Sequence, residues 1–378
     1  MATRMIQEAE TMTTTSVQSS SGPVPTRLVS LDAFRGFTMF WLMGGHAFIA
    51  ALATLGAPAT TFIAYQLDHS PWVGIRYYDL IWPSFMLMVG VSVPFSFARR
   101  SANQTRGQLM RQVWRRGIVL FLLGSLRASI SGRAPVWIEL SSALQPIALA
   151  YVVTAHLAGR AVRLQIAIAA GILGLYGLLL GLVPAPGLPA GSYEVNRNLV
   201  TAVDQMLLGR SHPEGWGTVL SAIPTISTTI IGLLFGQVLL SARSHGQKMR
   251  VFGLTGVGCL AAGFALSPAV PVIMKLWTAS YGLVSAGYAC LLFLLFYWLV
   301  DVRQHRKWAF PLVVIGTNAL AAYLGPTLVP TRRIAGIFTG PLAREIGAFG
   351  PVFSSAVVLL INWLILHWMY RRKIFLRA

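Results

Sequence analysis

Four ionisable residues lie at the edges of long apolar stretches of this 378-residue chain or within one of them: Asp32, His69 and Asp79 at the edges, and His46 within the first stretch. His69 lies in the segment "LDHSPWVGIRYYDLIWPSF", and Asp79 opens the apolar run that follows. A histidine changes charge near neutral pH, so one that is oriented by a carboxylate suits general-base catalysis. The alternatives are an ordinary loop histidine at position 69 and a helix-capping aspartate at position 79.

The first apolar run reads "SLDAFRGFTMFWLMGGHAFIAAL". Ser30 is a candidate N-cap, Asp32 lies in the first turn, and Arg35 follows at a spacing that allows an ion pair with Asp32. His46 lies eleven residues beyond Arg35, so on a straight helix both side chains project from one face, roughly 16 Å apart. A capped helix entrance with a snorkelling arginine is one interpretation, and a passage lined by a guanidinium and an imidazole is the other.

Further polar residues could contact a polar substrate. The long connection "YEVNRNLVTAVDQMLLGRSHPEGWGTV" holds Asp204 and Glu214, Lys275 lies in "VIMKLWTASYG", and Trp72 follows His69 closely. The connection is either a solvated loop or a re-entrant segment that acts as a lid. Asn318 in "GTNALAAYLG" lies among small apolar residues, which favours a hydrogen bond to another helix over a catalytic role.

The elements that must position these residues are membrane-spanning helices. Of all residues, 55% are hydrophobic and only 11% are charged, whereas about 25% are charged in soluble domains. Uncharged stretches of about 20 residues are long enough to cross roughly 30 Å of hydrocarbon. We therefore predict an all-α polytopic membrane protein with about ten transmembrane helices, at residues 29–53, 79–98, 111–130, 138–158, 163–183, 216–241, 249–268, 278–300, 310–329 and 350–370. Residues 1–26 are polar and rich in Ser and Thr, which predicts a disordered tail before a single transmembrane domain at 27–373.

The net charge of +19 is distributed as in a membrane protein rather than a nucleic-acid-binding one. Basic residues lie in short loops between apolar runs. With a cytoplasmic N-terminus, the cytoplasmic segments hold 20 Lys and Arg and the opposite loops hold nine, which predicts that both termini are cytoplasmic. His69 then lies on the extracytoplasmic side. The cluster that includes Arg115 and Arg116 suits anionic lipid or a phosphate-bearing ligand.

Several common chemistries have no motif in this sequence. The two cysteines, Cys259 and Cys290, lie in separate apolar runs, and their spacing predicts small hydrophobic residues rather than a redox site. No HExxH, P-loop, GxSxG or CxxC pattern occurs, so we predict neither a bound metal nor a common hydrolytic or NTPase site.

An ordered set of segments resembles the heparan-α-glucosaminide N-acetyltransferase family, its bacterial members most of all. The segments are "RLVSLDAFRGFTMFWLMGG", H-x-x-W-x-G-x-x-x-x-D-L-I-W-P-S-F, "HPEGWGTVLSAIPTISTTIIGLLFG", "KLWTASYGL" with "YWLVDV", and "WAFPLVVIGTNALAAYL". They cover roughly residues 27–370. The resemblance implies a multi-pass acyltransferase of the bacterial inner membrane. It would pass acetyl from cytoplasmic acetyl-CoA to an amino sugar or glycan on the far side, and a homodimer is a further implication.

The resemblance also implies roles for individual residues. Its catalytic histidine matches His69, which would act as a base or carry the acetyl group. The expected site residues are His69, Asp79 and His46 for catalysis, Asp32, Arg35, Arg115 and Arg116 for acetyl-CoA, and Trp72, Asp204, Glu214, Lys275 and Asn318 for the acceptor. Asn318 and Lys275 are also candidate oxyanion donors.

His46 departs from the family pattern, which has Asn in the animal enzyme and often an acidic residue in bacterial relatives. Two other functions fit the same spans and buried polar groups: a transporter for a small polar solute, and an acyltransferase for hydroxyl groups of envelope polysaccharides. We expect membrane lipid, and no nucleic acid, as a partner.

Overall fold

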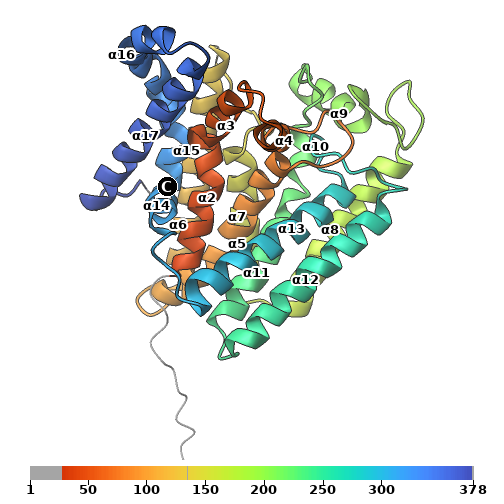
Figure 1. The fold of residues 1–378 in the computed structure, drawn as a ribbon. Coiled ribbons are helices and arrows are strands. Elements are labelled where there is room, and N and C mark those ends of the chain that lie inside the picture. The colour runs from red at the N-terminus through yellow and green to blue at the C-terminus, as the bar shows by residue number, and fades with distance from the viewer. Residues whose placement is uncertain (1–27, 134, 377–378) are drawn as a thin grey trace, which may run out of the picture.

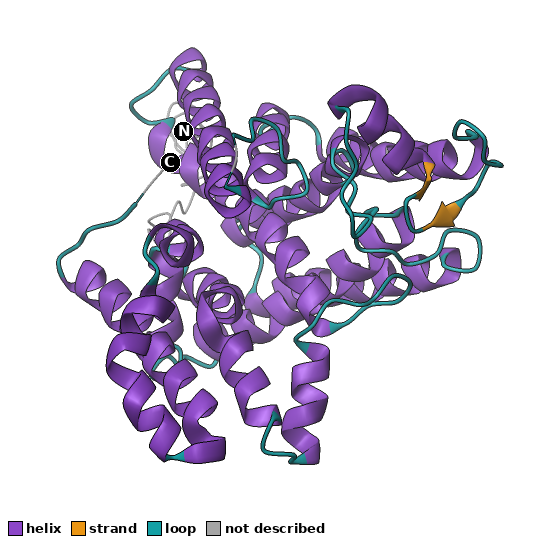
Figure 2. Ribbon diagram, turned by 90° about the horizontal axis from the view of Figure 1, so that it is seen from above, coloured by secondary structure: helices purple, strands orange, loops and turns teal. Residues whose placement is uncertain are grey.

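The apolar runs fold as helices that pack side by side (Figures 1 and 2). The computed structural model describes residues 28–133 and 135–376, so the predicted disordered tail at 1–26 lies outside the described residues. The α-helices are α2 (Val29–Phe40), α3 (His46–Ala53), α4 (Pro58–Gln66), α5 (Ile81–Arg100), α6 (Arg106–Gly132), α7 (Leu144–Leu157), α8 (Val162–Leu182), α9 (Leu199–Leu208), α10 (Val219–Ala222), α11 (Thr225–Leu240), α12 (His245–Leu266), α13 (Ala279–Phe296), α14 (Phe310–Thr317), α15 (Ala319–Leu328), α16 (Thr331–Glu345) and α17 (Gly350–Arg371).

Within the described residues, seven helices are long and apolar enough to cross a membrane. Some include short helical turns, which are η1 (Trp41–Gly45), η2 (Tyr77–Leu80), η3 (Tyr297–Val302) and η4 (Gly347–Phe349). An eighth span results if α14 and α15, bent by 73° at their junction, cross together. The prediction of a polytopic helical membrane protein is confirmed, whereas ten spans and cytoplasmic termini stay predictions.

The two remaining predicted spans also form helices. The segment predicted at 111–130 lies inside α6, which has 27 residues and carries several arginines. The segment predicted at 138–158 forms a helix only from Leu144, and α7 has 14 residues. At about 1.5 Å per residue α7 is shorter than the hydrocarbon core.

Three connections contain helices that periodicity did not indicate: α4, α9 and α16. Ahead of α9 the chain forms a small antiparallel pair, β1 (Tyr193–Glu194) and β2 (Arg197–Asn198), with Tyr193 opposite Asn198. The Asn198 side chain caps α9 by accepting from the Thr201 backbone N–H at 2.9 Å. The long connection after the fifth run is therefore structured rather than a freely solvated loop.

The first span differs from a straight helix in two ways. α2 begins at Val29, so Ser30 lies inside the first turn and is not the N-cap; its backbone N–H donates to Asp301 Oδ2 at 3.3 Å. The π-helical turn η1 then interrupts the span, with Gly44 at φ 150°, a backbone conformation open to glycine. Because this turn breaks the regular helical rotation between Arg35 and His46, the straight helix on which the expectation of a shared face rested is not formed.

Glycines allow very close helix contacts. A Cβ at Gly90 of α5 would overlap the Thr229 carbonyl of α11, and one at Gly316 of α14 would overlap the Asp32 carbonyl of α2. Close backbone approach of this kind is a common way for membrane helices to associate, since lipid is as apolar as their side chains.

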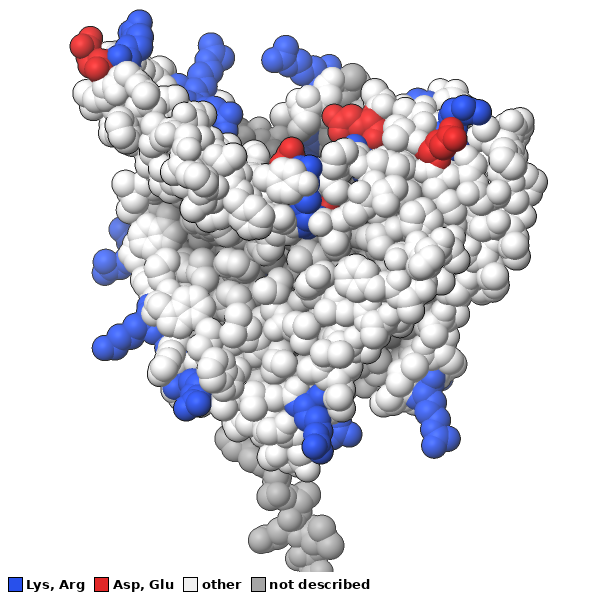
Figure 3. Space-filling model, turned by 45° about the vertical axis from the view of Figure 1, so that its right-hand side comes forward, with Lys and Arg blue, Asp and Glu red and all other residues white. Residues whose placement is uncertain are grey.

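The two ends of the helical bundle differ in charge. We call the end that carries His69, α4, α9 and α16 the histidine end, and the opposite end, with loops 101–105, 241–244 and 303–309, the basic end. On the face shown in Figure 3, acidic residues gather at the histidine end and basic residues lie at both ends.

Candidate active site

His69 and Asp79 form a hydrogen-bonded pair at the histidine end. His69 Nδ1 lies 2.7 Å from Asp79 Oδ1; the Asp79 side chain is fully buried, while the His69 side chain is 34% exposed. An ionised carboxylate only accepts hydrogen bonds, so Nδ1 of a neutral His69 carries the proton and Nε2 is the basic nitrogen. This is the orientation that general-base catalysis needs.

The second oxygen of Asp79 fixes the local backbone. Asp79 Oδ2 accepts the backbone N–H of Arg76 at 2.9 Å and that of Ser70 at 3.3 Å. Asp79 therefore caps the helix entrance, as one interpretation expects, and also contacts the His69 ring. Asp68, the sequence neighbour of His69, accepts the backbone N–H of His69 at 2.8 Å instead of contacting the ring.

Two further elements hold the His69 loop in place. The Arg76 guanidinium stacks 3.8 Å from the centre of the Tyr65 ring of α4 and donates to the His69 carbonyl at 3.0 Å. From α13, the Tyr281 hydroxyl donates to the Asp79 carbonyl at 2.6 Å. The loop is thus tied to helices on both sides, which limits the positions of the imidazole.

Aromatic rings surround the imidazole. The Tyr78 ring lies 4.8 Å from the His69 ring, and the Trp216 ring lies 5.2 Å from it, both edge-on. His46 packs behind Tyr78, with ring centres 5.5 Å apart. Trp216 occurs in the motif "HPEGWG", but its type alone did not distinguish it from an interfacial tryptophan, so sequence reasoning missed it.

Glu214 and Lys275 meet beside Trp216. Trp216 Nε1 donates to Glu214 Oε2 at 3.2 Å, and Lys275 Nζ lies 3.8 Å from the same oxygen. The hydrogen bond from Trp216, and then the Lys275 charge, lower the pKa of the Glu214 carboxyl below its usual range. Lys275 Nζ also lies 5.6 Å from the centre of the Trp216 ring. These two predicted acceptor-binding residues therefore border the His69 site.

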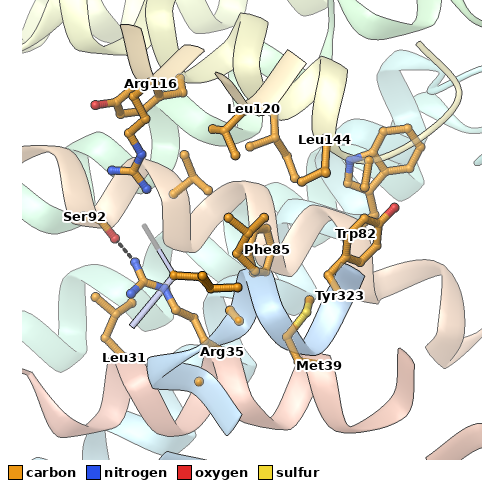
Figure 4. A pocket seen from close by; sticks show the side chains of 18 of the residues that line it. Leu31, Arg35, Met39, Trp82, Phe85, Ser92, Arg116, Leu120, Leu144 and Tyr323 are labelled. Carbon is orange, nitrogen blue, oxygen red and sulfur yellow. Dashed lines mark hydrogen bonds between the residues drawn. The ribbon is translucent and has the colours of Figure 1, made fainter. Parts of the chain in front are cut away.

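A cavity of about 1340 Å³ connects this site to the basic end. At the histidine end its wall includes His69 and Trp216, and at the basic end it includes Arg99, Arg100 and Arg115. Between the two ends the wall is mostly apolar and includes Leu31, Met39, Trp82, Phe85, Leu120, Leu144 and Tyr323 (Figure 4). The cavity thus joins a basic mouth to the histidine–aspartate pair.

Arginines from two helices reach into the cavity from opposite sides (Figure 4). Arg35 of α2 donates to Ser92 Oγ and lies 3.8 Å from Asp32 Oδ1, which confirms the predicted pairing with Asp32. Arg116 of α6 lies 4.8 Å from the centre of the Tyr151 ring, and its Nε has no hydrogen-bond partner among the described residues. Asp32, Arg35, Arg115 and Arg116, the residues predicted to bind acetyl-CoA, all line the cavity.

Arg127 is a cavity residue that sequence reasoning missed. It lies on α6 eleven residues after Arg116, so the two project from nearly the same face, roughly 16 Å apart along the helix. Its guanidinium lies 4.5 Å from the centre of the Tyr323 ring, and its Nε is buried with no hydrogen-bond partner in the described part of the chain. The eleven-residue spacing of two arginines in an apolar run is the signal that could have identified it.

Three predicted acceptor-binding residues lie off the cavity wall. Trp72 Nε1 donates to the Tyr193 carbonyl at 2.7 Å, which ties the His69 loop to β1. Asp204 is 1% exposed and accepts the Thr218 backbone N–H at 2.8 Å and its hydroxyl at 2.7 Å. Asn318 is fully buried and bonds the C-terminal segment. The contacts of all three hold one part of the chain to another.

The site can accept a proton, accept an acyl group at an imidazole nitrogen, and stabilise negative charge through arginine side chains. Among the described residues, no cluster of three or more His, Cys, Asp or Glu could hold a metal ion. Both cysteines are free.

Comparison with known proteins gives one distant relative and no matching family model. Heparan-alpha-glucosaminide N-acetyltransferase of Homo sapiens is 24% identical over an alignment that covers 80% of this chain and 53% of the human protein. The chain thus spans about half the length of the curated relative that it matches. This similarity agrees with the resemblance carried by the sequence motifs.

Proposed function

We propose that this protein is an integral membrane acyltransferase that moves an acetyl group from acetyl-CoA to the amino group of a glucosamine-like sugar. The observation that supports this most is the cavity, which has basic residues at one mouth and the His69–Asp79 pair at the other. In our proposal acetyl-CoA enters from the cytoplasm at the basic end, and the acceptor arrives at the histidine end outside the bacterial inner membrane.

Donor binding follows from charge. Arg35, Arg115 and Arg116 offer guanidinium groups for the phosphates of the CoA nucleotide, because guanidinium pairs well with phosphate oxygens. Asp32 holds Arg35 through the ion pair between them. The thinner acyl-carrying arm would then extend along the apolar wall toward His69.

The chemistry at His69 is an acyl transfer from sulfur to nitrogen. The neutral amine attacks the thioester carbonyl, His69 Nε2 takes the amine proton as the C–N bond forms, and the C–S bond breaks to release CoA as its thiol. Alternatively, Nε2 attacks first and carries the acetyl group before the amine receives it. Asp79 stabilises the positive imidazolium in the first route and orients the ring in both.

We propose that Arg127 stabilises the oxyanion that forms when the thioester carbonyl is attacked. Its guanidinium lies on the cavity wall, and its Nε has no hydrogen-bond partner among the described residues. We propose that the acceptor sugar binds to Trp216, Glu214 and Lys275, which border His69. His46 supports the Tyr78 ring that packs against His69. Trp72 and Asp204 hold neighbouring parts of the chain in position around this site.

The test is a variant in which His69 is replaced by alanine. Purified His69→Ala should lose at least about 100-fold in acetyl transfer from radiolabelled acetyl-CoA to glucosamine, while acetyl-CoA binding measured by calorimetry remains. A variant with the parent's turnover would remove His69 from the mechanism. A parallel screen of amino sugars and of polysaccharides that have only hydroxyl acceptors, read by thiol release, separates N-acyl from O-acyl transfer.

A transporter for a small polar solute is the second candidate, because the broken pair α14–α15 lies along the cavity and discontinuous helices are typical of transporters. The two functions differ in ligand. An acyltransferase should be stabilised against heat by acetyl-CoA, whereas saturable solute flux without any acyl-CoA would favour the transporter.

A further inference from the structure

The C-terminal segment folds back into the cavity. After α17 ends at Arg371, the chain turns at Lys373, whose φ is 56°, and the Ile374 backbone N–H donates to the Met369 carbonyl at 2.9 Å. Phe375 and Leu376 then line the same cavity as Arg35. The last described residues of the chain therefore form part of the cavity wall.

Asn318 holds this segment by its backbone. Asn318 Nδ2 donates to the Ile374 carbonyl at 2.9 Å, and Asn318 Oδ1 accepts the Leu376 backbone N–H at 3.0 Å. A single side-chain amide thus pairs with a carbonyl and an N–H two residues apart, as a strand backbone does in a parallel ladder. Asn318 lies at the break between α14 and α15, and its neighbours Thr317 and Ala319 line the cavity.

We propose that Asn318 is the binding site for the two secondary amides in the arm of the acyl donor, one offering its carbonyl and the other its N–H, and that residues 374–376 occupy this site when no donor is bound. The inference rests on the proposed function. The arm that links the CoA phosphates to the thioester contains two secondary amides, which offer the same carbonyl and N–H groups as the C-terminal backbone. Donor and segment would compete for one side chain.

The surroundings of Asn318 favour such an exchange. Its side chain is fully buried, so loss of the segment leaves a donor and an acceptor without partners unless a carbonyl and an N–H of a ligand replace them. Two of the three side chains of the segment are largely exposed, since Ile374 is 40% exposed and Leu376 is 50% exposed. Few buried apolar contacts allow local opening of this kind. A ligand amide can therefore displace the segment, whereas an apolar ligand cannot satisfy Asn318.

The experiment compares the parent with a variant that ends after Lys373, using two probes in calorimetry. The first probe is acetyl-CoA, and the second is adenosine 3′,5′-bisphosphate, which has phosphates but no arm. Removal of a competing segment should tighten acetyl-CoA binding by about three- to tenfold. The affinity for the armless nucleotide should not change. Unchanged acetyl-CoA binding, or an equal change for both probes, would overturn the inference.

Point variants separate the backbone contact from the side chain. Leu376→Pro removes the N–H that Asn318 accepts and should tighten acetyl-CoA binding, whereas Leu376→Ala keeps that N–H and serves as the matched control. Asn318→Ala in the shortened chain should weaken acetyl-CoA binding relative to the shortened chain alone; no change there would contradict a role for Asn318. If neither the parent nor any variant binds acetyl-CoA, the proposed function is wrong. If all of them bind acetyl-CoA with the same affinity, only the inference about the segment is wrong.

Discussion

At the scale of single residues, Asp79 serves two purposes with its two carboxylate oxygens. One oxygen contacts His69 Nδ1 and the other accepts two backbone N–H groups. These purposes can be separated experimentally, because asparagine keeps one carbonyl oxygen while alanine has none.

We expect Asp79→Asn to reduce the turnover number of acetyl transfer by roughly 10²–10⁴-fold, because an amide that donates to Nδ1 holds the imidazole in the wrong tautomer. Its melting temperature should stay near that of the parent, since the remaining oxygen can still accept the backbone N–H groups. Asp79→Ala should lose activity and also about 1–3 kcal/mol of stability. Parallel kinetics and thermal melts check both variants, and an active Asp79→Asn would show that the carboxylate is not needed.

Arg127 and Arg116 lie on one face of α6 but should have different effects. Arg127→Gln should lower the turnover number about 10²–10³-fold and leave the acetyl-CoA dissociation constant unchanged, as expected for loss of an oxyanion donor. Arg116→Gln should weaken acetyl-CoA binding instead, because in the proposed function Arg116 pairs with a phosphate of the bound donor. Added guanidinium should restore part of the activity of Arg127→Ala; a purely structural arginine would not respond in this way.

At the scale of helices, the packing of α5 against α11 depends on the absence of a side chain at Gly90. A Cβ there would overlap the Thr229 carbonyl, whereas one at Gly174 on the outer face of α8 would meet nothing within 4 Å. Gly90→Ala should therefore destabilise the protein by about 1–3 kcal/mol, with Gly174→Ala as the neutral control in thermal melts in detergent. Equal melting temperatures for the two variants would contradict this account of the helix pair.

At the scale of the whole molecule, the distribution of basic residues predicts which end faces the cytoplasm. Ala190 lies in the connection after α8 at the histidine end, and Ala242 lies between α11 and α12 at the basic end; both are exposed. In intact cells, a membrane-impermeant maleimide should label Ala190→Cys directly and Ala242→Cys only after permeabilisation. The reverse pattern would invert the orientation and move the donor site to the wrong side of the membrane.

The sequence by itself determined the class of the protein, most of its spans and the residue types of the candidate site. These properties are local: runs of apolar residues indicate helices in lipid, and motif spacing brings His69, Asp79, Arg35 and Asp32 to attention. Helix boundaries near Leu144 were less predictable, because an apolar residue such as Ile138 can lie in a helix or in the loop that precedes it.

The tertiary structure alone decided which side chains meet. It selected Asp79 rather than Asp68 as the carboxylate on His69, separated His46 from the cavity wall through the π-helical turn, and brought Arg127 and the C-terminal segment to the cavity. Such contacts join residues far apart in the chain, and their geometry depends on helix rotation and close glycine packing. Local periodicity carries no information about helix rotation or about glycine packing. The sequence therefore indicated which residues could act, whereas the packing of the helices decided which of them lie together.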